Sequence, residues 1–149
     1  MSKHHNRPTE GFVQLTLDHV GVSVQDLDRS TRFYVDVFGF AVEERFAIPD
    51  TDVCGAVLIH PSGARVELFP RPGSHTRPTG HPIESTREQR WFQTAFRVTD
   101  VPDVFTRVVV AGASAVKPPF VAPDGRSTIA FIGDPDGNLI ELIQRGAVN

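Results

Sequence analysis

The chain has 149 residues, of which 40% are hydrophobic, and this size suits one domain with a sizeable core. Its formal net charge of -3 lacks the basic excess that binding to a phosphate backbone needs, so we expect no nucleic-acid partner. The single cysteine, Cys54, excludes an intrachain disulfide and a cysteine-based metal cage. We expect no membrane association and a cytoplasmic location, because the sequence has no long apolar run and no signal-peptide core.

The first half of the sequence predicts four strands and one helix. Residues 12–24 alternate apolar with smaller or polar side chains, which predicts a strand with its valines on one face and His19 on the other. Asp26 stands where an N-cap would, ahead of apolar residues at helical spacing that end at Gly39. Three further strands are predicted after this helix, at 40–46, 55–60 and 64–69.

A polar connection follows at 70–90, where four prolines and two glycines predict no regular element. A connection of this length is either a functional loop, such as a lid, or a linker. Beyond it the sequence predicts a strand at 91–98 and a helix that is capped by Asp100 and ends near Gly112. The last three strands are predicted at 113–120, 127–133 and 138–144.

The two halves are copies of one unit. HPSGARVELF, at 60–69, has a second copy in GDPDGNLIEL, at 133–142, in which Pro61 matches Pro135, Gly63 matches Gly137 and Glu67 matches Glu141, each at an offset of 74 residues. The same offset carries LDHVGVSVQDL onto WFQTAFRVTDV. Two copies of this length predict two modules related by a pseudo-twofold axis. We therefore expect a disordered tail at 1–12 and a single domain at 13–145, with its modules at 13–69 and 91–145.

Four polar side chains occupy matching places in the two copies. Glu67 and Glu141 lie mid-strand between aliphatic residues, where an ionised carboxylate is costly to bury unless it is paired or binds a cation. His19 stands 48 residues before Glu67, and Gln93 stands 48 residues before Glu141. The pseudo-twofold predicts that all four meet at one point. One imidazole and three oxygen donors suit a divalent cation with water sites left open.

Each of these residues also has an ordinary structural interpretation. His19 could be a satisfied buried histidine, the two glutamates could be solvated, and Gln93 could hydrogen-bond a water on the metal. Arg97 could bind a substrate carboxylate or phosphate, or pair with a neighbouring acid. Three aromatic residues could line an apolar substrate pocket or belong to the core, namely Phe69, Phe46 and Trp91.

Three motifs resemble the vicinal oxygen chelate superfamily, which includes glyoxalase I, antibiotic-resistance proteins such as the bleomycin-resistance group, and extradiol dioxygenases. They are LDHVGVSVQDLDRSTRFYVDVFGF, GARVELF and FIGDPDGNLIEL. The resemblance covers residues 15–145. It implies an α+β fold in which two tandem βαβββ modules form an eight-stranded, cup-shaped mixed sheet with helices outside. It also implies a homodimer, a small-molecule substrate and one divalent metal ion, which could be Zn, Ni, Co, Mn or Fe.

The family's ligand positions fall on His19, Glu67, Gln93 and Glu141. Many relatives carry histidine where this chain has Gln93, and an amide carbonyl is an acceptable oxygen ligand. The resemblance to glyoxalase I implies a lyase, isomerase or epimerase that forms an enediolate next to a carbonyl, with Glu67 or Glu141 as the base and Glu67 favoured. Two alternatives stay open: a metal-free protein that binds small, antibiotic-like molecules, and an extradiol-type Fe(II) dioxygenase. The dioxygenases resemble a plan of two histidines and one carboxylate, so the presence of only one histidine, His19, among the four ligand positions counts against this second alternative.

Overall fold

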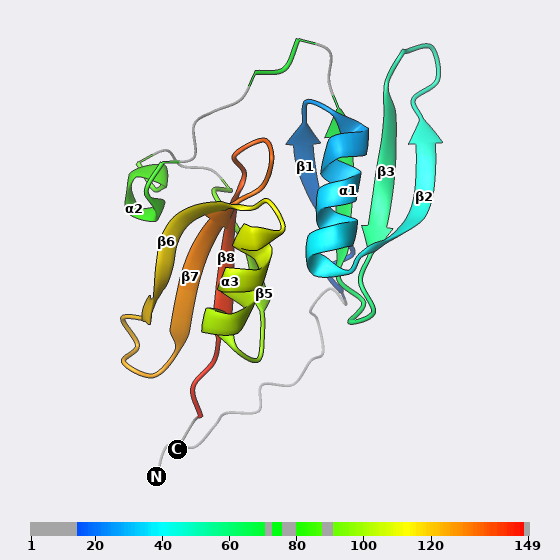
Figure 1. Cartoon of the computed structure of the whole chain (residues 1–149). Coiled ribbons are helices and arrows are strands. Elements are labelled where there is room, and N and C mark those ends of the chain that lie inside the picture. Colours follow the sequence, from blue (N-terminus) through cyan, green and yellow to red (C-terminus); the bar gives the residue numbers. More distant parts are fainter. Residues whose placement is uncertain (1–14, 71–72, 76–79, 88–90, 148–149) are drawn as a thin grey trace, which may run out of the picture.

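The computed structural model describes residues 15–70, 73–75, 80–87 and 91–147, and Figure 1 shows their arrangement. The predicted disordered tail at 1–12 lies outside these residues. Two βαβββ modules follow one another along the chain, as the internal repeat predicts. None of the helices in the described part of the chain is long and apolar enough to cross a membrane.

Module one contains one helix and a four-stranded sheet in the order β1-β4-β3-β2, in which only β1 and β4 run parallel. The Asp26 carboxylate caps the helix by accepting from the Arg29 N–H at 2.9 Å, and Gly39 ends it in the left-handed region at a φ of 76°. These observations confirm the predicted caps. The elements are β1 (Val20–Val24), α1 (Leu27–Phe38), β2 (Ala41–Ala47), β3 (Cys54–Ile59) and β4 (Arg65–Pro70).

Module two repeats this topology, with the strand order β5-β8-β7-β6 and a parallel pair formed by β5 and β8. Asp100 caps its helix by accepting from the Asp103 N–H at 2.9 Å. In the turn between β7 and β8, Asp134 accepts from two backbone N–H groups and Gly137 has a φ of 78°. The elements are β5 (Thr94–Arg97), α3 (Val101–Val110), β6 (Ser114–Val121), β7 (Thr128–Gly133) and β8 (Leu139–Gln144).

The first strand of each module is shorter than predicted. The predicted strand at 12–24 is β1, Val20–Val24, and the predicted strand at 91–98 is β5, Thr94–Arg97. Both lie at the edge of their sheet, so each can extend only as far as the single neighbouring strand pairs with it. That pairing begins at Val66 and Ile140, respectively. As a result, His19 immediately precedes β1 and Gln93 immediately precedes β5, so neither residue lies in the middle of a strand.

The connection between the modules also differs from prediction, because it contains a short helix, α2 (Pro82–Ser85). A proline suits the first turn of a helix, where its missing N–H is not needed. The His81 side chain caps this helix by accepting from the Ile83 N–H at 3.4 Å. This local capping supplies the regular element that the proline-rich composition did not predict.

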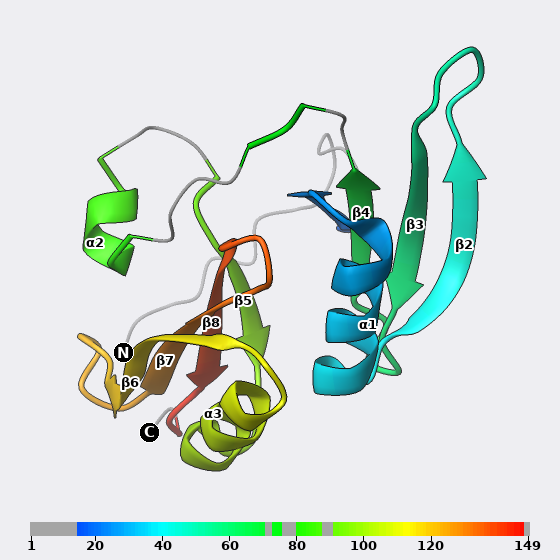
Figure 2. The same cartoon turned by 45° about the horizontal axis from the view of Figure 1, so that its top comes forward.

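The two modules share one hydrophobic core. Alternate residues of the central strands face it from both sheets, among them Leu68 of β4 and Leu142 of β8, both 0% exposed. Across the module boundary, the Phe38 ring of α1 lies 5.3 Å from the Phe96 ring of β5. The eight strands are hydrogen-bonded as two separate sheets, and Figures 1 and 2 show β1 and β5 at the edges nearest the other module.

A polar latch, formed by Asp134 and Asp136 of the β7–β8 turn with α1, joins the modules. The Asp136 carboxylate accepts from Arg29 Nη2 at 2.6 Å and from Ser30 Oγ at 3.0 Å. Tyr34 donates its hydroxyl to Asp134 at 3.2 Å. Burial raises the pKa of Asp134, although hydrogen bonds from Asn138 act in the opposite direction. The latch fixes module two against the helix of module one.

Candidate metal-binding site

His19 and Glu67 form a pair on module one. His19 immediately precedes β1, and Glu67 lies in β4 directly opposite Gly21 of β1. The Nε2 atom of His19 is 3.5 Å from Oε2 of Glu67, and the two side chains are 40% and 28% exposed. A Cβ atom at Gly21 would lie 3.6 Å from the same carboxylate oxygen, which is an ordinary van der Waals distance. This pair is the first half of the predicted ligand set.

The spacing of this pair fits a shared cation. Two ligand atoms that are each about 2.1 Å from one tetrahedral zinc ion lie about 3.4 Å from one another. The observed separation of 3.5 Å between His19 Nε2 and Glu67 Oε2 matches that value. An imidazole nitrogen and a carboxylate oxygen are also ordinary zinc ligands. The distance between these two atoms is therefore compatible with binding of one divalent ion by both side chains.

Gln93 and Glu141 form the equivalent pair on module two, where the Gln93 amide donates a hydrogen bond to Oε2 of Glu141. Glu141 lies in β8 directly opposite Ala95 of β5. The amide nitrogen now faces the carboxylate, so rotation of the amide by half a turn would present the Gln93 carbonyl oxygen to a cation. The donor set of this pair thus also fits a metal ion.

The structure keeps the two pairs apart. Among the described residues, no three His, Cys, Asp or Glu side chains are placed to hold one metal ion, so His19, Glu67 and Glu141 do not gather at one point. The sequence predicts that the four side chains converge but does not decide whether they do so within one chain or across two, and the described residues of one chain do not bring them together. The physical reason is the packing of the modules, whose common core lies on the sheet faces opposite those that carry Glu67 and Glu141.

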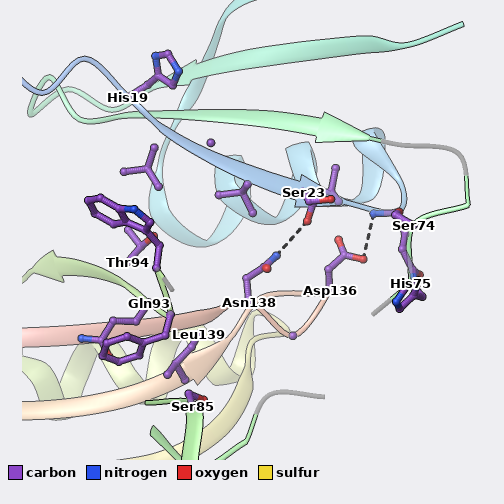
Figure 3. A pocket seen from close by; sticks show the side chains of 18 of the residues that line it. His19, Ser23, Ser74, His75, Ser85, Gln93, Thr94, Asp136, Asn138 and Leu139 are labelled. Carbon is purple, nitrogen blue, oxygen red and sulfur yellow. Dashed lines mark hydrogen bonds between the residues drawn. The ribbon is translucent and has the colours of Figure 1, made fainter. Parts of the chain in front are cut away.

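A pocket of about 720 Å³ lies between the modules and is lined by both His19 and Gln93. Figure 3 shows His19 beside the strands of module one and Gln93 beside those of module two. Between the modules, Asn138 donates to the Ser23 carbonyl at 3.3 Å. Residues of both modules therefore line this pocket.

The predicted aromatic residues lie in two places. The Phe46 and Phe69 rings on module one have centroids 6.2 Å apart, and Phe69 shares its strand and face with Glu67. Gly55 makes room for Phe46, because a Cβ atom there would be 2.3 Å from the ring. Trp91 does not belong to the core, since it lines the pocket and is 97% exposed. Phe46 and Phe69 thus form an aromatic pair beside Glu67, called here the Phe46–Phe69 wall, to which Trp91 does not belong.

Two charged groups near His19 were not singled out from the sequence. Asp18 Oδ2 lies 2.8 Å from His19 Nδ1, and this hydrogen bond raises the pKa of His19 and lowers that of Asp18. Arg65, two residues before Glu67, makes two hydrogen bonds to Glu43, at 2.6 and 2.8 Å. Asp18 could have been found from the sequence, because an acidic residue directly precedes the candidate ligand His19. The Arg65–Glu43 pair joins two strands that are distant in the sequence, so no local pattern indicates it.

Arg97, the predicted anion-binding residue, ends β5 and is exposed. It lies four residues after Gln93, so the two residues share a face if the extended backbone continues to Gln93. No neighbouring acid pairs with it among the described residues. Its guanidinium is thus available to a ligand.

Comparison with known proteins identifies a matching family and several similar proteins. The model of the glyoxalase/bleomycin resistance protein/dioxygenase superfamily matches residues 16–142. Lactoylglutathione lyase GLX1 of Arabidopsis thaliana is 33% identical over 131 residues, which are 86% of this chain and 44% of that protein. Virulence protein STM3117 of Salmonella typhimurium is 31% identical over 134 residues, covering 86% of this chain and 83% of that protein. The chain thus spans less than half of the plant relative.

Solved structures give the same result. Glyoxalase I from Zea mays superposes with a TM-score of 0.64 at 28% identity, over 88% of this chain and 45% of that chain. A glyoxylase/bleomycin resistance protein/dioxygenase domain from Frankia sp. EAN1pec has a TM-score of 0.73 over 92% of this chain and 96% of its own, and at 21% identity it bears on the fold alone. The chain therefore belongs to the glyoxalase/bleomycin resistance protein/dioxygenase superfamily.

Proposed function

We propose that the protein is a divalent-metal-dependent, glyoxalase-type lyase or isomerase that acts next to a carbonyl group of a small molecule. The observation that carries this proposal is the His19–Glu67 pair, whose atoms have the 3.5 Å separation expected for two ligands of one ion. The repeat supplies a second pair, Gln93 and Glu141, with compatible donors. Membership of the superfamily and the lactoylglutathione lyase names of several relatives support the same assignment.

The four side chains would hold the ion, and the ion would supply polarisation of the substrate carbonyl and stabilisation of negative charge that develops there. The chain's own residues would move the proton. Glu67 is our choice of base, because it stands between His19 and the Phe46–Phe69 wall. A carboxylate in this position can take a proton from the carbon next to the carbonyl and return it to a neighbouring carbon or oxygen.

We further propose that a second copy of the chain completes the site. The outer edge strands are poor partners, because β2 has three consecutive charged residues at 43–45 and β6 has two prolines at 118–119. By contrast, large apolar side chains beside the candidate ligands are exposed in the single chain, with Trp91 at 97% and Leu17 at 77%. Association of two copies through this region would bury both residues and could bring a His19–Glu67 pair to a Gln93–Glu141 pair.

The substrate proposal rests on Arg97 and on the apolar wall. A free guanidinium suits a carboxylate or phosphate of the substrate, while the Phe46–Phe69 wall suits an apolar group. Because several relatives are named lactoylglutathione lyase, formation and cleavage of lactoylglutathione is the first activity to assay. The expected result is turnover that depends on added metal and is strongly reduced by Arg97→Ala through a higher KM.

Metal analysis of protein purified without chelator tests the proposed class. We expect zinc, nickel, cobalt or manganese to copurify, and removal of the ion to abolish turnover. Iron together with oxygen consumption would instead identify the dioxygenase alternative. Absence of any bound ion, combined with tight binding of a small apolar molecule, would identify the metal-free binding alternative and contradict the proposal.

A further inference from the structure

Asp18 precedes His19 in the chain and contacts one side of its ring. Oδ2 of Asp18 lies 2.8 Å from Nδ1 of His19, whereas Nε2 of the same ring lies 3.5 Å from Oε2 of Glu67. The two ring nitrogens thus have different surroundings. Nδ1 faces a hydrogen-bond acceptor that takes no part in the candidate ligand set, and Nε2 faces the other candidate ligand.

This arrangement decides which nitrogen can bind a cation. A neutral imidazole carries one proton, and only the nitrogen without the proton has a free lone pair. The hydrogen bond made by one nitrogen fixes the tautomer and so determines which nitrogen is available to a metal. A carboxylate that accepts from the second nitrogen of a metal-binding histidine is a common arrangement in proteins.

Comparison of the two modules provides an independent argument. The position that matches Asp18 in the second copy is Phe92, and the position that matches His19 is Gln93. The acid therefore accompanies the imidazole and is absent beside the amide. An amide has no tautomer to select, so Gln93 needs no acceptor behind it, and its own side chain donates directly to Glu141.

Arg65 is the cation that could compete for Asp18. Its guanidinium is held by two hydrogen bonds to Glu43, at 2.6 and 2.8 Å. Bidentate pairing of this kind also fixes the direction of the remaining N–H groups. Within the described residues, His19 is the only hydrogen-bond partner of the Asp18 carboxylate.

We propose that Asp18 is a positioning residue that holds His19 in the Nδ1–H tautomer, so that Nε2 is directed toward Glu67 and a divalent cation. The second part of this statement rests on the proposed metal-dependent function. The first part concerns the metal-free protein and can be tested separately. Asp18 itself does not contact the cation or the substrate.

The tautomer can be measured by long-range ¹⁵N–¹H correlation spectra of the metal-free protein, recorded well above the ordinary histidine pKa of about 6.5. A His19→Gln spectrum identifies the His19 signals. We expect the Nδ1–H pattern in the wild type, its loss in Asp18→Ala, and its retention in Asp18→Asn, which keeps an acceptor oxygen. The exposed helix residue Asp36 gives a matched control, and Asp36→Ala should leave the pattern unchanged.

An Nε2–H pattern in the wild type, or an unchanged pattern in Asp18→Ala, would overturn the proposal. Titration with zinc chloride then tests the consequence. Asp18→Ala should weaken zinc binding about 10- to 100-fold, Asp18→Asn should weaken it less, and Asp36→Ala should not weaken it. Equal zinc affinity in Asp18→Ala and wild type would contradict the positioning role. If the wild type shows the Nδ1–H pattern but binds no zinc, the metal-dependent function fails while the Asp18–His19 orientation stands.

Discussion

Replacement of Asp136 by alanine should destabilise the protein, because Asp136 of module two accepts hydrogen bonds from three residues of module one. Its carboxylate accepts from Ser30 Oγ at 3.0 Å, from Arg29 Nη2 at 2.6 Å and from the Gln25 N–H at 3.3 Å. Asp136 is 7% exposed and Ser30 is 0% exposed. The substitution would therefore remove an acceptor from donors that water reaches poorly, and it would loosen the contact between the modules.

The magnitude follows from the burial of each partner. A buried hydroxyl without its acceptor costs about 1 to 3 kcal/mol, so the loss at Ser30 dominates. Arg29 has a side chain that is 43% exposed, which limits its ion pair to about 0 to 1 kcal/mol. The free energy of unfolding should fall by about 1 to 4 kcal/mol in total. For a domain of this size that corresponds to a decrease in Tm of about 3 to 13 °C.

Urea unfolding followed by circular dichroism measures this change. Asp52→Ala is a suitable control, since Asp52 is an exposed turn residue, and its cost should be below about 0.5 kcal/mol. In a double-mutant cycle, Asp136→Ala and Ser30→Ala should show a coupling energy of at least about 1 kcal/mol. A loss at Asp136 no larger than that of the control, or additive effects in the cycle, would refute the latch between the modules.

Three further predictions follow from particular contacts. Gly55→Ala should lower the free energy of unfolding in urea by about 1 to 3 kcal/mol, because the new methyl group would collide with the Phe46 ring. Gly80→Ala is the control, since its methyl group meets only ordinary contacts and should cost less. Equal losses in the two variants would contradict this account of the Phe46–Phe69 wall. Asp124 has a pKa lowered from 3.8 to about 2, chiefly by its hydrogen bond from Ser127. The pKa of Asp124 is lower in the folded than in the unfolded protein, so ionised Asp124 stabilises the fold above pH 3.8, and this contribution is lost as the pH falls toward 2. The difference in unfolding free energy between wild type and Asp124→Asn should therefore shrink between pH 3.8 and 2 and stay constant at higher pH. In sedimentation velocity, Trp91→Glu should shift the protein toward the monomer if a second copy covers this exposed side chain, and an unchanged dimer would place the interface elsewhere.

Elements whose own sequence contains the residues that start and end them could be predicted. The first helix was predictable because Asp26 and Gly39 supply an N-cap and a left-handed stop beside the apolar pattern. The start of β1 was not predictable in this way, because the length of an edge strand depends on where β4 pairs with it. The latch had no sequence signal either, since Asp136 and Ser30 are 106 residues apart and meet only after both modules have folded.

The candidate site was predictable in its parts but not in its assembly. The repeat identified His19 with Glu67 and Gln93 with Glu141, and the structure brings each pair together. Strand alternation could not show how the two modules are placed, because that depends on which sheet faces form the common core. For the same reason, the relation between the two pairs stays a proposal about the assembled protein.

The stoichiometry of metal binding tests the central claim most directly. The protein, with all 149 residues present, freed of metal and titrated with zinc chloride, should bind one ion per chain. Binding should be severely weakened by Glu67→Gln and by Glu141→Gln, while the exposed helix residue Glu84 provides a control in Glu84→Gln. Binding that depends on both glutamates would support a cation site built from the two repeats. Absence of binding, or binding that neither glutamate substitution weakens, would contradict it.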